Sequence, residues 1–305
     1  MNTASKSFAV AAAAAGALLA ASGVPALGSP HAAHVRSTLV TTPTLVVTMG
    51  NGPTKSDPTV FKMVGPRKFS AGRVNVVLHA LKGEQELAIM RLHSGYRMSK
   101  LKSDFATYGQ AQDNPTPAAL KALNRIVRRT TFFGGLDSGG GHTTVSGSVV
   151  VPKAGTYYLL DDTIGPAQGV IRKLHVSPRA GSRIAPAVSA HVTAVTAKRF
   201  RGSKNLPASG TIEFTNKSTN SPHFLFLQHV KKGTTRKQVI KGFQGKPPGP
   251  FLRDAVGTDV VHMGKSQTLT YTLPAGDYAE VCFFPDLKTG MPHAFMGMVR
   301  IVHLS

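Results

Sequence analysis

The chain has 305 residues, of which 41% are hydrophobic and 16% charged. This composition excludes an intrinsically disordered protein and leaves room for two ordinary domains. The 36 Lys and Arg outnumber the 14 Asp and Glu, for a formal net charge of +22. The excess is spread almost equally over the two halves of the chain, which disfavours a specific nucleic-acid binder and favours attraction to an anionic wall, a membrane surface or an acidic partner protein.

The first 28 residues have the pattern of an export signal. A short polar stretch with Lys6 precedes an apolar run over 8–21, and small residues follow around Ala26 and Gly28. The run is short for a membrane span, and no later run is apolar enough to cross a bilayer. We therefore predict cleavage near Gly28, a secreted or extracytoplasmic protein, and a flexible lead-in over 29–44.

Most of the remaining chain is predicted to be strand. Short runs rich in Val, Ile, Thr, Phe and Tyr recur between Gly, Pro, Asn and Asp residues, as in 73–81, 144–151, 211–216 and 267–273. One short helix is predicted over Pro117 to Arg129, where an early proline precedes apolar residues at three-to-four spacing. This pattern favours an all-β protein built of antiparallel β-sandwiches.

The sequence also contains a long internal repeat. Residues 71–95 align without gaps on 209–233, and later 152–161 aligns on 274–282 and 169–176 on 297–304. Because the two halves share their beginning, middle and end, we predict tandem domains rather than a solenoid. The predicted boundaries are 45–178 and 189–305, joined by a linker over 179–188.

The chain has one cysteine, Cys282, which cannot form an internal disulfide. In an exported protein such a residue is a buried inert thiol, an intermolecular bridge or a metal ligand. Its neighbourhood favours a ligand, because Cys282 opens the segment 282-CFFPDLKTGMPHAFMGM-298 and a histidine, His223, follows Pro222 earlier in the same domain.

These two segments resemble the ligand segments of the cupredoxins, the plastocyanin-like blue copper proteins. In that family one histidine comes from the start of a strand and a C-terminal loop supplies Cys, His and Met. The resemblance implies a Greek-key β-sandwich with one type 1 copper bound by His223, Cys282, His293 and Met298. The spacing His293-x4-Met298 matches that of plastocyanin.

The chemistry of copper explains why these residue types occur together. A thiolate and two imidazoles in a trigonal plane, with a weak axial thioether, suit both the +1 and +2 states. The thiolate of Cys282 would be the bound form. Phe283 and Phe284 are predicted to keep water from the sulfur and to raise the reduction potential.

The segment departs from the family pattern in the length of its loop. Ten residues separate Cys282 from His293, more than in plastocyanin or azurin, although the entropic cost of closing a loop grows only logarithmically with its length. Met291 and Met296 compete with Met298 for the axial position. Both could instead pack in the core, or form an apolar docking patch around His293, whose edge is predicted to be exposed and to admit electrons.

The histidines leave further alternatives. His223 could be an ordinary surface or core imidazole, and His229 is interpreted as structural or exposed. In the first half the repeat aligns Gln85 on His223, Asp161 on Cys282 and Val170 on Met298, so that domain is predicted to keep the scaffold and lack the metal. Its own histidines do not restore the site at matching positions and are interpreted as structural or exposed: His79, His93, His142 and His175.

Three functions follow from these residues. The first is electron transfer by a mononuclear type 1 copper, with a redox partner protein or an anionic cell-surface component as partner and no specific nucleic acid. The second is extracellular copper capture or delivery, with Cys282, His293 and nearby methionines as Cu(I) ligands. The third is a metal-free cell-surface interaction protein. Oxidase or reductase activity is not predicted, because His-x-His pairs are absent and Val281 precedes the cysteine.

Overall fold

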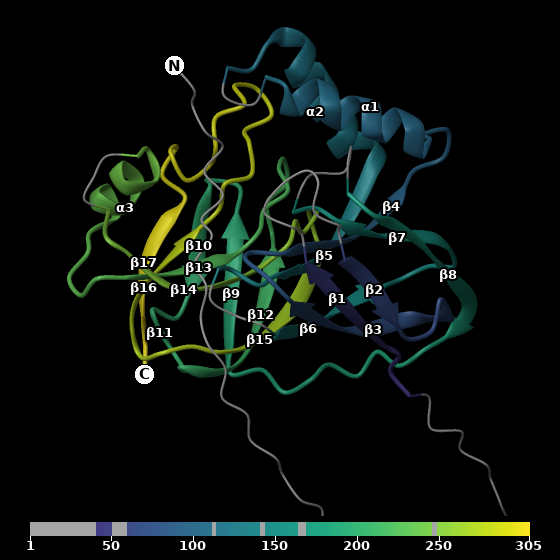
Figure 1. The fold of residues 1–305 in the computed structure, drawn as a ribbon, viewed down its shortest axis with the longest axis horizontal. Helices are drawn as coiled ribbons and strands as arrows, with labels where there is room; N and C mark the ends of the chain where they lie inside the picture. The colour runs from purple at the N-terminus through teal and green to yellow at the C-terminus, as the bar shows by residue number, and fades with distance from the viewer. Residues whose placement is uncertain (1–40, 51–59, 112–113, 141–143, 164–168, 246–248) are drawn as a thin grey trace, which may run out of the picture.

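The computed structural model describes residues 41–50, 60–111, 114–140, 144–163, 169–245 and 249–305 (Figure 1). The predicted export signal, most of the lead-in and His142 lie outside this part of the chain. Within it, no helix is long and apolar enough to cross a membrane.

The first half of the chain forms eight strands and two helices. They are β1 (Thr44–Gly50), β2 (Val60–Val64), β3 (Lys68–Ala80), β4 (Glu86–Leu92), α1 (Met98–Gly109), α2 (Pro117–Arg129), β5 (Thr130–Asp137), β6 (Thr144–Val151), β7 (Gly155–Asp161) and β8 (Ile171–Ala180).

The second half follows the same order with one helix and an added short strand. Its elements are β9 (Ala190–Val195), β10 (Arg199–Gly202), β11 (Asn205–Leu206), β12 (Ser209–Asn216), β13 (Phe226–Val230), α3 (Arg236–Phe243), β14 (Phe251–Thr258), β15 (Ser266–Thr272), β16 (Gly276–Val281) and β17 (Val299–Leu304).

The strands form two sheets that each run through both halves. One has the order β2-β1-β3-β6-β15-β12-β9-β10. The other has the order β3-β8-β7-β4-β5-β14-β13-β16-β17-β11, with β3 contributing its first residues to this sheet and the rest to the other. The main hydrophobic core lies between the sheets and draws on both halves. The predicted fold of two tandem Greek-key sandwiches is confirmed.

The two sandwiches meet through matching edge strands. β6 pairs antiparallel with β15, and β5 pairs antiparallel with β14. In each case a strand of the first half pairs with its own counterpart in the second, which gives the molecule an approximate two-fold axis. Ser148 and Thr268 face each other in the β6–β15 pair, and their buried hydroxyl oxygens are 2.8 Å apart. These four strands consequently expose no free edge at the boundary.

A buried amide joins the two sheets across the same boundary. The side chain of Gln267 in β15 donates from Nε2 to the carbonyl oxygen of Gly135 at 2.8 Å and accepts from its N–H at 2.6 Å. Gly134 has a φ of +103°, and a Cβ built there would overlap the Gln267 amide oxygen. Glycine at this position therefore allows the close approach of the Gln267 side chain to strand β5.

The local sequence explains the predicted helix and two others that were not predicted. α2 begins and ends as predicted, with Thr116 accepting from the Ala119 N–H as N-cap and five small or apolar residues buried. α1 buries only Leu101 and Asp104, and α3 buries only Val239. A helix with so few buried apolar residues carries little amphipathic signal. The predicted helix α2 is confirmed, but the prediction that it is the single helix is wrong, because the described part of the chain also contains α1 and α3.

The connection between the halves also differs slightly from the predicted one. β8 runs to Ala180, which places the first residues of the predicted linker in a strand, and β9 begins at Ala190. The domain boundaries themselves stay a prediction.

Candidate metal centre

His223 and Cys282 are brought together at one end of the second sandwich. Pro222 precedes His223, which forms an isolated bridge to Val261: its N–H donates to the Val261 carbonyl at 3.1 Å and its carbonyl accepts from the Val261 N–H at 2.7 Å. Cys282 directly follows β16, in the sheet next to β13.

His293 comes from the loop between β16 and β17, residues 283–297, which we call the ligand loop. The His293 N–H donates to the carbonyl of Phe284 at 3.0 Å, and its carbonyl accepts from the Met298 N–H at 2.8 Å. These bonds turn the imidazole back toward the cysteine and leave Met298 directly before β17. The side chains of Cys282, His293 and Met298 are all fully buried.

The three donor atoms form a compact triangle. Cys282 Sγ lies 3.6 Å from His223 Nδ1 and 3.9 Å from His293 Nδ1, and the two nitrogens are 3.1 Å apart. Three coplanar donors at about 2.0 to 2.3 Å from one ion would be about 3.5 to 4.0 Å apart. The two sulfur–nitrogen distances lie in this range and the nitrogen pair is slightly closer, so the triangle fits a small metal ion with little adjustment.

The kind of donor atom favours copper among the metals. Both imidazoles are fully buried, and the Nε2 atoms of His223 and His293 have no hydrogen-bond partner in the described part of the chain. Two imidazoles and one thiolate in a trigonal arrangement are the donor set of type 1 copper.

Burial controls the protonation of all three donors. The pKa of His223 is lowered to about 3, mainly by loss of hydration and further by His293 and Lys198. Loss of hydration and then Lys198 lower the pKa of His293 to about 4, although Asp286 acts in the opposite direction. Burial raises the pKa of the Cys282 thiol to about 12. Near neutral pH the metal-free site therefore holds two neutral imidazoles and a protonated thiol.

The sulfur is surrounded by backbone amides and by one of the two predicted phenylalanines. The N–H groups of Phe224 and Phe284 hydrogen-bond to the Cys282 sulfur. The Phe284 ring is buried with its centroid 6.1 Å from that of His293. Phe283 instead packs in a separate cluster, 4.6 Å from the ring of Phe243. Phe284 is thus the phenylalanine that faces the site.

One prediction about access to the site is wrong. His293 has no exposed edge, because its side chain is fully buried. The side chains of Met291 and Met296, on either side of it in sequence, are instead 49% and 41% exposed, so neither packs in the core. The axial role of Met298 stays a prediction, and its burial in the same core cluster as Cys282 favours it over the exposed Met296.

Sequence reasoning missed the residue that supports His223. Asn216, fully buried at the end of β12, donates from Nδ2 to the carbonyls of Ser221 at 3.0 Å and Val261 at 2.8 Å. It also accepts from the N–H of Ser218 at 2.9 Å. These bonds fix the turn that leads to His223. Residues 216–218 read Asn-Lys-Ser, which matches the acceptor motif for N-glycosylation, but both amide hydrogens of the buried Asn216 are used in these bonds. The only sequence signal was an Asn at the end of a predicted strand.

The matching positions in the first half form no such site. Gln85 donates from Nε2 to the Lys82 carbonyl at 2.7 Å, and Asp161 is fully buried with its Oδ1 accepting from the Thr163 N–H. The described histidines of this half lie elsewhere: His79 contacts Thr144, and His93 contacts Thr131. In the second half, His229 stacks on Tyr278 and bonds to Asp254, as expected of a structural residue.

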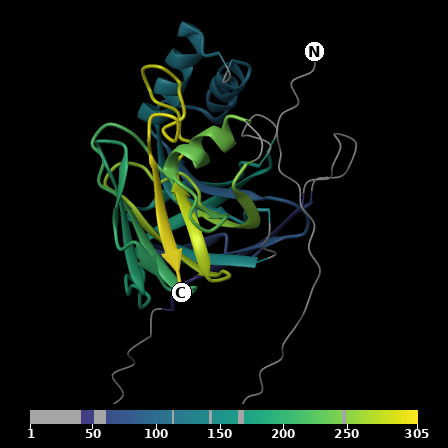
Figure 2. The same cartoon turned by 90° about the vertical axis from the view of Figure 1, so that its left-hand side faces the viewer.

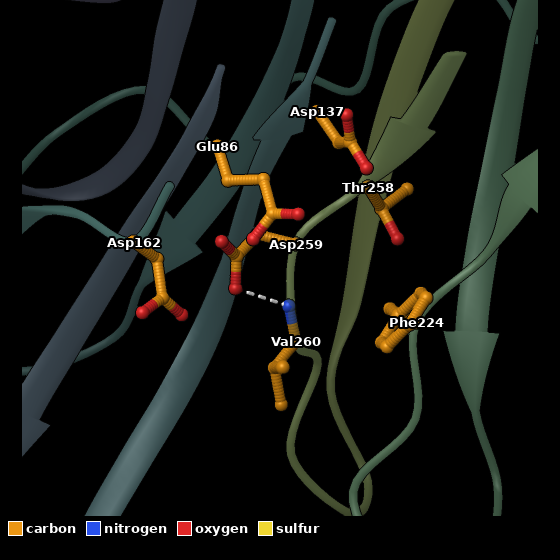
Figure 3. Close-up of a pocket in the computed structure, with 7 residues that line it drawn as sticks. All are labelled: Glu86, Asp137, Asp162, Phe224, Thr258, Asp259 and Val260. Carbon is orange, nitrogen blue, oxygen red and sulfur yellow. Dashed lines mark hydrogen bonds between the residues drawn. The ribbon is translucent and has the colours of Figure 1, made fainter. Parts of the chain in front are cut away.

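A cluster of acidic side chains lies where the two sandwiches meet, and it was not predicted (Figure 3). Carboxylate oxygens of Glu84, Glu86 and Asp137, and of Glu86, Asp162 and Asp259, lie within 4.8 Å of one another. Asp137 ends β5 and Asp259 follows β14, the two strands that pair across the boundary, so the cluster lies near the approximate two-fold axis. A cavity of about 50 Å³ is lined by four of these carboxylates and by Phe224, Thr258 and Val260.

Burial in the acidic cluster raises the pKa values of its carboxyls, which favours their neutral form. Burial, and then the neighbouring carboxylates, raise the pKa values of Glu86 and Asp162 well above their usual range. The same two causes act on Asp137, although the Gly139 N–H opposes them. Burial raises the pKa of Asp259 to about 6 despite its bond from the Val260 N–H.

Comparison with known proteins gives the following results. No protein-family model matches the chain, and no curated protein matches it. Among solved structures, an auracyanin from Roseiflexus castenholzii aligns over 38% of this chain and 94% of its own, at 21% identity and a TM-score of 0.26. Auracyanin B aligns over 41% and 93%, at 23% identity and 0.28. A copper-containing nitrite reductase from Thermus scotoductus SA-01 aligns over 87% and 61%, at 13% identity and 0.24.

These TM-scores are below 0.5, so the class of the protein depends on the strand pairing and the site themselves. A Greek-key sandwich with two histidines and one cysteine converging at one end is the arrangement of a blue-copper, or cupredoxin, domain. The second half of this chain has that arrangement. The first half repeats the sandwich without the donors.

Proposed function

We propose that this chain is a secreted electron-transfer protein with one type 1 copper, held by His223, Cys282, His293 and Met298. The observation that carries the proposal is the buried triangle of two Nδ1 atoms and one sulfur, each within 3.9 Å of the others. When bound, copper supplies a one-electron couple between its +1 and +2 states.

The protein's own residues prepare the site for this chemistry. The imidazoles are already neutral and the three donors already converge, so little has to move when the thiol gives up its proton. The buried Phe284 ring and the complete burial of the donors exclude water. Backbone N–H groups on the sulfur stabilise a thiolate and restrain its position. A rigid, dry site limits reorganisation between oxidation states.

The expected partner is a redox protein or cell-surface component with an anionic surface. The net charge of +22 supports long-range attraction to such a partner. Helix α3 and the turn before it add an exposed basic face close to the ligand loop, where Arg236 donates to the Gly297 carbonyl at 2.6 Å. The exposed basic residues of this face are Lys231, Lys232, Arg236, Lys237 and Lys241.

The test is copper loading of the full mature chain. Wild type is expected to bind one Cu(II) with an intense visible thiolate-to-copper band and a type 1 paramagnetic spectrum, whereas Cys282→Ala and His223→Ala should lose the band. His303→Ala is the matched control, because this histidine is exposed and its ring bonds to the Asp277 carboxylate. A protein that binds copper equally well without Cys282 would rule the proposal out.

Copper capture or delivery is the second candidate. The exposed thioethers of Met291 and Met296 beside the buried His293 favour it, because soft sulfur ligands suit Cu(I). Tight, colourless Cu(I) binding without a stable Cu(II) form would support this function over electron transfer. Replacement of both methionines by Leu should then slow Cu(I) uptake.

A further inference from the structure

We propose that helix α2 of the first sandwich positions the ligand loop of the second, with Asn124 as the residue that holds it. This inference rests on the proposed copper function for its biological meaning and on the contacts between the two halves for its physical basis. It gives the metal-free half a role at the metal site of the other half.

The ligand loop has a tight internal structure between Cys282 and His293. Pro285 and Pro292 form a bridge, and the N–H of Asp286 donates to the Met291 carbonyl at 2.9 Å. The Asp286 carboxylate accepts from the N–H groups of Lys288 and Thr289, each at 3.0 Å. The extra residues of this long loop therefore form a small hairpin rather than an irregular connection.

The tip of that hairpin rests on α2. The side-chain amide of Asn124 donates to the Leu287 carbonyl at 2.6 Å and to the Leu120 carbonyl of its own helix at 2.9 Å. Gly290 lies against Pro115 and Leu120 so closely that a Cβ there would be 2.4 Å from Pro115 Cγ. In both views the ligand loop, which precedes β17, lies beside helices α1 and α2 (Figures 1 and 2).

α2 is itself firmly held, as a support must be. Arg125 makes a two-pronged contact with the buried Asp104 of α1, at 2.6 and 2.7 Å, and the Tyr96 hydroxyl donates to the same carboxylate at 2.8 Å. The inner face of α2 packs against β4 and β5 through Ile126. Such a bidentate, partly buried contact is among the stronger polar interactions in proteins.

Two contacts from the second sandwich hold the rest of the loop. The Lys198 ammonium lies 2.7 Å from the Asp286 carboxylate, and Arg236 holds the Gly297 carbonyl. Asn124 supplies a hydrogen bond from the other sandwich to the hairpin tip. His293 comes directly after Pro292, which closes the hairpin. Movement of the tip therefore moves the imidazole.

Asn124→Leu removes the donor and keeps the size of the side chain. In the metal-free full chain we expect faster deuterium exchange at 286–293. In the copper-loaded chain we expect a shifted thiolate-to-copper band and about three- to tenfold faster loss of copper to a chelator, the effect of one lost hydrogen bond at a partly buried site. Gly290→Ala, which pushes the tip away from Pro115, should give the same pattern.

Lys121→Ala is the matched control, since this residue is exposed on the same helix and should leave exchange, spectrum and copper loss as in wild type. If Asn124→Leu matches Lys121→Ala in exchange at 286–293, the inference is overturned. A wild-type chain that binds no copper would instead defeat the proposed function, and the exchange comparison in the metal-free chain would still decide the role of α2.

Discussion

Cys282 is the one donor that must change its protonation state when a metal binds. Its pKa is raised to about 12 by burial, whereas the pKa values of His223 and His293, lowered to about 3 and about 4, leave both rings neutral above that range. The cost of forming the thiolate is therefore part of the cost of binding. Selectivity for a strongly thiophilic ion follows, because a weakly binding cation cannot displace the proton.

Copper affinity should accordingly rise with pH. Between about pH 5 and 8 the thiol is protonated and the imidazoles are not, so one proton leaves per ion and the apparent affinity should rise about tenfold per pH unit. Competition with a chelator of known pH dependence measures this slope. An affinity independent of pH would show that the Cys282 thiolate is not a ligand.

Asp259 in the acidic cluster gives a second effect of pH, on folding. Its folded-state pKa, about 6, is above the unfolded value of about 4. The folded chain therefore binds more protons between these values, and its free energy of unfolding falls as pH rises through that window. The loss is complete about one pH unit above the folded-state pKa.

Asp259→Asn should therefore stabilise the chain at pH 8 by on the order of 1 to 3 kcal/mol and change little at pH 4. Asn keeps the acceptor for the Val260 N–H. Denaturant unfolding at both pH values measures the difference, in buffer with a chelator so that no divalent cation neutralises the cluster. Equal stabilisation at pH 4 and pH 8 would contradict a charge effect.

The residues of the site differ in how far the sequence could predict them. Cys282, His293 and His223 were predictable because a lone cysteine and two histidines lie in segments that resemble a known pattern, and the structure brings them together. The burial of His293 was not predictable from the sequence, because it depends on how the long ligand loop folds and packs. The acidic cluster was not predictable either, because its members come from segments far apart in the chain.

At the scale of elements, helix α3 depends on its N-terminal cap. Thr235 accepts from the Gln238 N–H, and the Gln238 side chain accepts from the Thr235 N–H in return. With Val239 as its one buried residue, this short helix has little packing to stabilise it. Its capping box therefore matters more than it would in a long, well-packed helix.

Thr235→Ala should cost about 1 kcal/mol of local stability. The expected result is faster deuterium exchange over 236–243. It should extend to the Gly297 region, because Arg236 of the same helix holds that carbonyl. Thr235→Ser keeps the hydroxyl and serves as the control. An unchanged helix in Thr235→Ala would mean that side-chain packing, rather than the cap, holds α3 in place.

The elements show where sequence patterns are informative. Strands over 144–151 and 211–216, and helix α2, were predictable because their apolar residues follow one regular period and turn residues or a cap mark their ends. α1 and α3 were not, because their burial is slight. The repeat predicted two copies of one sandwich, but pairing between the copies depends on backbone groups that carry no side-chain signature.

At the scale of the whole molecule, the two sandwiches complete each other's sheets. β14 and β15 of the second half find their outer partners only in β5 and β6 of the first. Without the first half these strands would be open edges, with unpaired backbone groups that template association.

An isolated second half, residues 189–305, should therefore dimerise through β15. The pairing of β6 with β15 shows the geometry, because the missing strand can be supplied by β15 of another copy. Sedimentation of this fragment beside the full chain tests the prediction. A fragment that stays monomeric and as resistant to denaturant as the full chain would show that the shared sheets contribute little.

The same pairing has a meaning for the origin of the protein. Each boundary strand lies against its own counterpart, which is the arrangement left when the gene of a symmetric homodimer is duplicated and the copies are fused. In the described part of the first half, Gln85 and Asp161, which the sequence aligns on His223 and Cys282, hold no such donor set, whereas its boundary strands and helix α2 contact the second half.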